Sequence, residues 1–145
     1  KLQKLDIQPY DILVEKSGGS PDQPVGRVAI LLPDIFEDNT LCYSNFIHKF
    51  RVNSSIIYPK YLFAFLKVMH NIKLTDTMQS QTNGIRDLIM REYWNQDIPM
   101  PPLAKQKEIA KKYFELKDKA QNLFSQAQSD FEQAKKEIEQ LILKP

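Results

Sequence analysis

The sequence predicts an α+β protein: a mixed α/β domain with several short strands, followed by one long C-terminal coiled-coil helix. Short apolar runs interrupted by proline and glycine fill residues 1–101, whereas residues 103–143 contain neither of these two amino acids. Glycine and proline are the least favourable residues in a helix interior, so their absence from the second segment favours one continuous helix. We therefore predict a domain at 1–101 and a helical segment at 102–145.

Three apolar segments in the first part predict strands. Asp11–Glu15 is a short apolar run, Arg27–Leu32 is a second, and Phe46–Val52 alternates in the manner of a strand, with Phe46, His48, Phe50 and Val52 on one side and Ile47, Lys49 and Arg51 on the other. Short runs and strict alternation are typical of buried and half-buried strands. Between the first two runs, the segment Ser17–Pro21 predicts a turn, because its glycines permit positive φ and its proline ends regular structure.

The rest of the first part predicts a helix, a loop and one more apolar run. Pro59 suits the first turn of a helix, and apolar side chains follow at helical spacing, which predicts a helix over residues 59–70. A polar stretch, Thr75–Asn83, precedes the apolar run Ile85–Met90, and its second part, Gln79–Asn83, is predicted to be a solvated loop. Ile98–Pro102 must be extended, because a residue before proline is disfavoured in the α region.

The C-terminal helix has one apolar side. Its apolar or small residues recur at alternating steps of four and three, with one four-residue stutter, which is the pattern of a coiled-coil seam. The seam consists of Ile109, Tyr113, Leu116, Ala120, Leu123, Ala127, Phe131, Ala134, Ile138 and Leu141.

This seam requires a partner. A helix over residues 103–143 spans roughly 60 Å at about 1.5 Å per residue. A domain of about 100 residues has a radius of gyration of only about 13 Å. The domain is therefore too small to cover the whole seam, and we expect a second helix of the same type or another subunit to cover it.

The charge distribution points weakly to nucleic acid. The net charge is only +2, but no carboxylate occurs from Asn39 through Thr75. Cations without neighbouring carboxylates favour phosphate contact, although snorkelling lysines on a buried region give the same pattern. The basic residues of this stretch are Lys49, Arg51, Lys60, Lys67 and Lys73, with His48 and His70 beside them.

The sequence offers no catalytic or metal-binding constellation. His48 and His70 lack an acidic cluster, Cys42 has no cysteine partner, and motifs for nucleotides or zinc hydrolysis are missing. The adenine methyltransferase tetrapeptide Asn-Pro-Pro-aromatic is missing too. No apolar run reaches the length of a membrane span, and a single cysteine fits a reducing cytoplasm. We expect a cytoplasmic binding module with no membrane contact, no metal and no catalytic residues.

Several segments, in this order, resemble the target-recognition domains of the specificity subunits of type I restriction–modification systems. Asp11–Gly19 resembles the "gDIL…G" strand and turn, with Tyr10 where the family often has glycine. Tyr43–Phe46 resembles the following strand entry, Pro59–Phe63 the "p.yl" helix, and Thr82–Leu88 the "tGirnL" stretch.

The most specific likeness lies where the domain meets the long helix. Ile98–Ile109 closely resembles "iPlPPl.EQ..I", which in the family joins each recognition domain to its spacer helix, and Lys105 replaces the usual Glu. The resemblance covers nearly the whole chain. Recognition domains are usually longer before the first of these strands, so we expect that the N-terminal part of this domain is absent.

The resemblance implies a non-catalytic role in reading double-stranded DNA. A specificity subunit carries two recognition domains and two spacer helices, which pair antiparallel and set the distance between the halves of a split target. Methyltransferase subunits, which bind S-adenosylmethionine, dock on this core, and a restriction subunit joins for cleavage. Because this chain holds one half, we expect a homodimer through the C-terminal helix and no cofactor of its own.

Polarity and segment order give candidate DNA contacts in two classes. Gln and Asn can pair with base edges, and cations can meet phosphates. The candidates for contact with the DNA backbone are Lys16, Ser17, Lys49 and Arg51. The candidates for contact with bases or a groove are Gln79, Gln81, Asn83 and Arg86.

Two other functions fit the sequence. The chain could be the C-terminal recognition module of a fused N6-adenine methyltransferase, which the sequence upstream of Lys1 would reveal. It could also be a globular cap on a coiled coil that binds other proteins and no nucleic acid. Strongly salt-dependent DNA binding would separate the second of these from DNA recognition.

Overall fold

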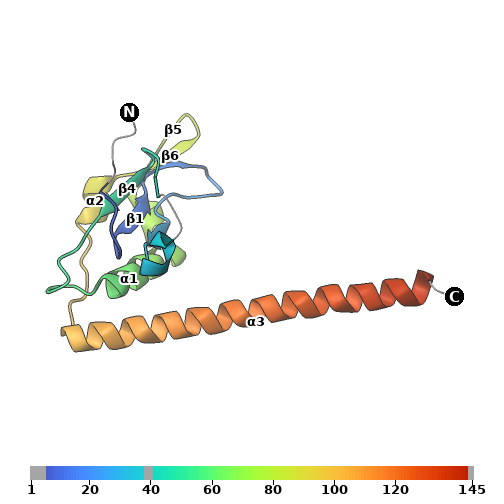
Figure 1. The fold of residues 1–145 in the computed structure, drawn as a ribbon. Helices are drawn as coiled ribbons and strands as arrows, with labels where there is room; N and C mark the ends of the chain where they lie inside the picture. Colours follow the sequence, from blue (N-terminus) through green and yellow to red (C-terminus); the bar gives the residue numbers. More distant parts are fainter. Residues whose placement is uncertain (1–5, 38–40, 144–145) are drawn as a thin grey trace. The chain divides into compact units, whose positions relative to one another are not determined.

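The computed structural model describes residues 6–37 and 41–143 and confirms the α+β class. Two small antiparallel sheets and two helices precede one long helix (Figure 1). In chain order the elements are β1 (Ile12–Glu15), β2 (Ser17–Gly19), β3 (Val28–Ile30), the 3₁₀ helix η1 (Pro33–Phe36), β4 (Ile47–Phe50), α1 (Pro59–Asn71), the 3₁₀ helix η2 (Leu74–Met78), β5 (Gln79–Thr82), β6 (Ile85–Leu88), α2 (Met90–Trp94) and α3 (Leu103–Leu143).

The first sheet has the strand order β3-β1-β4 and contains the three strands that the sequence predicts. The central strand β1 pairs antiparallel with both neighbours, with Val14 opposite Val28 on one side and His48 on the other. Successive side chains of a strand point to opposite faces. Ile12 and Val14 therefore share one face, and both are fully buried.

The second sheet, of order β2-β6-β5, corrects two expectations. Ser17–Gly19 was expected in a turn but forms β2, which pairs with β6 through a bulge at Gly18, whose φ is +93°. The turn follows it, where the backbone N–H of Ser20 donates to Gln23 O at 2.9 Å and the N–H of Gln23 donates back to Ser20 O at 3.1 Å. Pairing with a strand some 70 residues away thus decides the conformation of a segment whose local signal indicates a turn.

The expected solvated loop at Gln79–Asn83 is wrong as well. Most of it forms the strand β5, which follows η2 and pairs residue for residue with β6 from Gln79↔Leu88 to Thr82↔Ile85. Asn83 and Gly84, with φ of +52° and +81°, connect the strands. Positive φ at both central residues defines a type I′ turn, whose twist suits a two-residue hairpin and which favours Asn-Gly.

The predicted helix at 59–70 is confirmed as α1, which supplies much of the core. Pro59 occupies its first turn, and the helix packs against β3 and η2. Tyr61, Leu62, Phe63, Ala64 and Leu66 of this helix are all buried. Burying each large apolar side chain contributes roughly 1.5–3 kcal/mol, so these residues are a major source of stability for the domain.

Gln106 and Tyr61 hold the extended proline-rich segment against α1. The Gln106 side chain is 1 % exposed and donates to Pro101 O at 2.9 Å, while its Oε1 accepts from the backbone N–H of Tyr58 at 2.7 Å. The Tyr61 hydroxyl donates to Pro99 O at 2.7 Å. Backbone groups that an extended segment leaves without secondary-structure partners are thereby satisfied.

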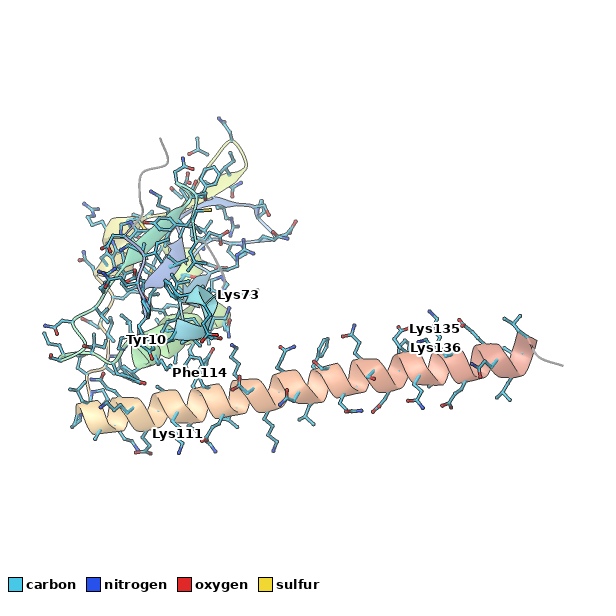
Figure 2. All side chains as sticks on the ribbon, in the orientation of Figure 1. Tyr10, Lys73, Lys111, Phe114, Lys135 and Lys136 are labelled. Atoms are coloured by element: carbon cyan, nitrogen blue, oxygen red, sulfur yellow. The ribbon has the colours of Figure 1, made fainter. Side chains whose placement is uncertain are left out.

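The chain divides into two compact units, residues 1–108 and residues 109–145. The predicted long helix is confirmed as the unbroken α3, whose first turn belongs to unit 1 and whose remainder forms unit 2 (Figure 1). Apart from the half-buried Tyr113, the side chains of its seam are exposed in the single chain, for example Leu123 at 61 % and Phe131 at 67 %. The side chains of Lys111, Lys135 and Lys136 project from the same helix (Figure 2). Within the described residues, no helix combines the length and the apolar character that crossing a membrane requires.

Candidate nucleic-acid interface

Seven of the eight predicted DNA contacts fall into two groups in unit 1. Lys49 lies in β4 and Arg51 directly follows that strand, so both belong to the first sheet. Five others are in the second sheet or its hairpin turn, and Lys16 lies between the two sheets. The members of the second-sheet group are Ser17, Gln79, Gln81, Asn83 and Arg86.

The first group is organised around Asp11, whose side chain is fully buried. Arg51 donates to both carboxylate oxygens of Asp11, from Nε at 2.7 Å and from Nη2 at 3.0 Å. Lys49 Nζ lies 3.4 Å from Asp11 Oδ2 and donates to the backbone O of Asp6 at 2.6 Å. Arg51 also contacts the Asp6 carboxylate at 3.2 Å. Two carboxylates therefore compensate the charges of these two cations.

The protonation of Asp11 reflects this cluster. Burial by itself raises the pKa of the Asp11 carboxyl, because it disfavours the charged form. Hydrogen bonds from Arg51 and from the Gln8 backbone N–H, together with the positive charges of Lys49 and Arg51, outweigh burial and lower the pKa below 3.8. Asp11 is therefore an ionised carboxylate near neutral pH and anchors Arg51 in a bidentate pair.

Lys16 and Ser17 lie where the chain passes from one sheet to the other. The backbone N–H of Lys16 donates to Phe46 O at 2.8 Å, and its carbonyl accepts from the backbone N–H of Leu88 at 2.8 Å. The hydroxyl of Ser17 donates to the carboxylate of Asp87. Backbone bonds thus fix the position of Lys16, while Ser17 is already hydrogen-bonded inside the domain.

Gln79 is a half-buried residue that braces the second sheet. Its Nε2 donates to Thr75 O at 3.1 Å and to Val25 O at 3.2 Å. Its Oε1 accepts from the backbone N–H of Val25 at 3.3 Å. This side chain therefore holds the loop at Val25 against η2 and β5, and its polar atoms are engaged within the fold.

Gln81 and Arg86 form a cross-strand pair of predicted contacts. They are directly opposite each other in the β5–β6 hairpin, so their side chains leave the same face of the ribbon. No ion pair to Arg86 and no side-chain hydrogen bond of Gln81 occurs among residues 6–37 and 41–143. The hairpin from Ser80 to Ile85 is exposed, and it projects from the second sheet (Figure 1).

The structure brings three of the predicted residues together around one hollow. This hollow has a volume of about 240 Å³ and is lined by Asp76, Gln79, Ser80, Gln81 and Arg86. Sequence reasoning missed Asp76, because nothing in the polar stretch Thr75–Asn83 singled out its one carboxylate. Its position three residues before Gln79 is informative only once η2 and β5 are known.

His48, which the charge pattern drew attention to, packs in an aromatic cluster. Its ring lies edge-on to Trp94 with centroids 5.4 Å apart, and Phe50 contacts the same indole at 4.9 Å. Tyr93 lies behind Trp94, and burial raises the pKa of its hydroxyl. Within the described part of the chain, no group of three or more His, Cys, Asp or Glu side chains could hold a metal ion.

The comparisons with known proteins give one match. The family model described as "Type I restriction modification DNA specificity domain" matches residues 1–138. Searches of curated proteins and of solved structures found no match. The family match covers both the strands around the hollow and most of α3, as the resemblance in the sequence led us to expect. The chain therefore belongs to the family of type I restriction–modification DNA specificity domains.

Proposed function

We propose that this chain reads one half of a split DNA target for a type I restriction–modification complex, with the β5–β6 hairpin as its base-reading element. A role in DNA sequence recognition follows from membership of the family, whose specificity domains are non-catalytic. The observation that carries the finer proposal is the exposed hairpin, with Gln81 and Arg86 on one face and Asn83 at its tip. A two-stranded ribbon with amide and guanidinium groups fits the major groove, where base edges differ.

The other predicted contacts have different roles in this proposal. Gln79 acts indirectly, because its amide holds the base of the hairpin through Val25 and Thr75. Lys16 and Ser17 remain candidates for contact with the DNA backbone beside the hairpin. Lys49 and Arg51 remain candidates too, but we expect a weaker contribution from them, because Asp6 and Asp11 compensate their charge.

We further propose that α3 is the spacer and docking helix of the complex. Its exposed seam would pair antiparallel with the α3 of a second copy and so hold two recognition domains at a set separation. Methyltransferase subunits that carry S-adenosylmethionine would dock on this core, and a restriction subunit would join them. We place the assembly in the cytoplasm, where its DNA substrate is accessible.

Selection from a pool of randomised duplex DNA tests the proposed function. We expect the full chain to enrich a sequence motif, and its affinity for that motif to fall steeply with salt, because each neutralised phosphate releases counterions. A chain that binds all duplexes equally, or binds none at low salt, would contradict sequence recognition. The matched control is the same selection with Leu116→Asp/Leu123→Asp, which we expect to enrich only a half-motif, because it would separate the two copies.

A further inference from the structure

The hollow beside the hairpin contains groups of opposite charge. Arg86 and Gln81 approach it from β6 and β5, and Asp76 approaches it from η2. Residues directly opposite in an antiparallel pair have Cβ atoms about 4.5–5.5 Å apart, so the guanidinium of Arg86 and the amide of Gln81 can meet one ligand. One oxygen of the Asp76 carboxylate is buried and lacks a hydrogen-bond partner among the described residues.

The carboxylate decides between two possible ligands for Arg86. A phosphate would accept hydrogen bonds from the guanidinium, but it would also place its negative charge beside Asp76, and like charges repel. A base pair offers acceptors and donors together. Guanine presents O6 and N7, which a bidentate arginine recognises, and cytosine presents the N4 amino group, which a carboxylate accepts.

The position of the hairpin makes such an approach feasible. Its tip at Gly84 has no other atom within 4 Å of the place where a Cβ would be, so the turn is bare. The width of the major groove, about 12 Å, admits a two-stranded ribbon. Gln79 fixes the root of this ribbon through its hydrogen bonds, which limits how far the hairpin can move relative to η2 and Asp76.

We propose that Arg86 recognises a guanine in the major groove and that Asp76 excludes phosphate from the same hollow and accepts from the amino group of the paired cytosine. Gln81 beside them contacts the neighbouring base pair. This inference rests on the proposed function and adds to it one specificity-determining arginine, one carboxylate and the base pair that they select. Arg86 contributes specificity to binding, whereas a phosphate contact would contribute affinity without specificity.

The test compares the motifs that variants of the full chain select from randomised duplex DNA. We expect Arg86→Ala to keep the rest of the motif and to lose the preference for guanine at one position. On the unaltered motif its affinity falls roughly tenfold to a hundredfold, and it no longer discriminates against duplexes changed at that base pair. Arg86→Lys keeps the charge but loses the bidentate geometry, so we expect it to weaken discrimination more than overall affinity.

Two controls make the outcomes distinct. Arg91→Ala removes an equal charge from the exposed surface of α2 and should leave the motif unchanged. Asp76→Asn removes the negative charge that would repel a phosphate from the hollow. The variant should therefore bind duplexes without the motif more tightly and prefer the motif less strongly. The contrary outcome is that Arg86→Ala weakens binding to all sequences equally and reduces the slope of log affinity against log salt concentration by about one, the value for one phosphate contact. Arg86 would then be a backbone contact, and the inference would be overturned.

Failure of the inference can be separated from failure of the proposed function. If the unaltered chain selects a motif and Arg86→Ala selects the same motif with the same affinity, then the hairpin does not read this base pair, and DNA recognition stands. If the unaltered chain selects no motif, the proposed function itself is contradicted, and the inference falls with it.

Discussion

The side-chain oxygen of Gln106 accepts a hydrogen bond from the backbone N–H of Tyr58 at 2.7 Å, and this bond joins the first turn of α3 to the N-terminus of α1. The amide nitrogen of the same side chain donates to Pro101 O at 2.9 Å and to Ile56 O at 3.4 Å. One buried glutamine therefore satisfies backbone groups from two segments that no helix or strand ladder satisfies. This role explains the glutamine of the "iPlPPl.EQ..I" pattern in this chain.

Gln106→Ala should lower the free energy of unfolding by about 2–4 kcal/mol. The substitution leaves a buried N–H and two carbonyls without partners, and each such group costs roughly 1–3 kcal/mol unless water reaches it. Denaturant unfolding at a fixed protein concentration measures the loss. Gln121→Ala, on the exposed part of α3, is the matched control and should change stability by less than about 0.5 kcal/mol. Equal effects of the two substitutions would contradict the anchoring role.

Asp11→Asn should remove part of the acid sensitivity of the fold. Because the pKa of Asp11 is lowered in the folded state, its ionised form stabilises the protein above the unfolded pKa of about 3.9. That stabilisation disappears as the pH falls through the lower, folded pKa. At neutral pH we expect the variant to be about 2 kcal/mol less stable, since Lys49 and the half-exposed Arg51 lose their carboxylate.

The measurement for Asp11 is the free energy of unfolding as a function of pH. The difference between the unaltered chain and Asp11→Asn should be constant near neutral pH and shrink below about pH 4. Asp22→Asn, an exposed aspartate outside the cluster, serves as the control and should follow the unaltered chain. A difference that stayed constant down to pH 2 would show that the pKa of Asp11 is the same in the folded and the unfolded protein, which would contradict the lowered pKa.

Tyr10→Gly should be more stable than Tyr10→Ala by about 1 kcal/mol. Tyr10 has φ +69°, a left-handed conformation that costs a residue with a Cβ roughly 1–2 kcal/mol and glycine almost nothing. Both variants lose the tyrosine ring, so their difference isolates the backbone. Thermal unfolding of the two variants measures it. If alanine were equal to glycine here, the positive φ of Tyr10 would carry no strain, and the glycine usual at this position of the family would need another explanation.

Leu116→Asp/Leu123→Asp should abolish self-association through α3. Both leucines lie on the seam and are exposed in the single chain, at 53 % and 61 %, so a paired helix would have to bury the new carboxylates. Sedimentation or light scattering measures the oligomeric state. Asn122→Asp/Ser129→Asp places the same charges at the same spacing on the opposite side of α3 and should leave association unchanged. An unchanged oligomeric state in the leucine variant would contradict the prediction that copies of the chain associate through this seam.

Local patterns in the sequence were sufficient for α1, for α3 and for the first sheet, whereas the short helix α2 (Met90–Trp94) was not predicted. The helix α1 and the strands β1 and β3 agree with their apolar spacing, because each of them buries side chains in the core. The strand β4 is half-buried along its length and pairs with β1. The local patterns failed for β2 and β5, which are rich in serine, glycine and glutamine and have little apolar spacing of their own. Those two strands are held chiefly by their ladders with β6, which no short segment reveals.

The candidate site shows the same division. Polarity and segment order were enough to pick Gln81, Asn83 and Arg86, which lie together in the exposed hairpin. They could not show that Gln79 differs from these three residues. Its side-chain amide is hydrogen-bonded to Val25, a residue 54 positions away in the chain. Nor could they show Asp76 beside Gln81 and Arg86, because Asp76 lies in η2, outside the β5–β6 ladder, and only the folded chain brings it to the same hollow.

What the sequence determined by itself is therefore the α+β class, the continuous α3 with its apolar seam, and the family. Periodicity, the absence of Gly and Pro, and the order of short motifs are all properties of neighbouring residues. What only the tertiary structure decided is which polar groups are already engaged. The carboxylate of Asp11 holds Arg51 across 40 residues, whereas Arg86 faces an open hollow. Partners distant in sequence decide whether a cation stabilises the fold or is available to a ligand.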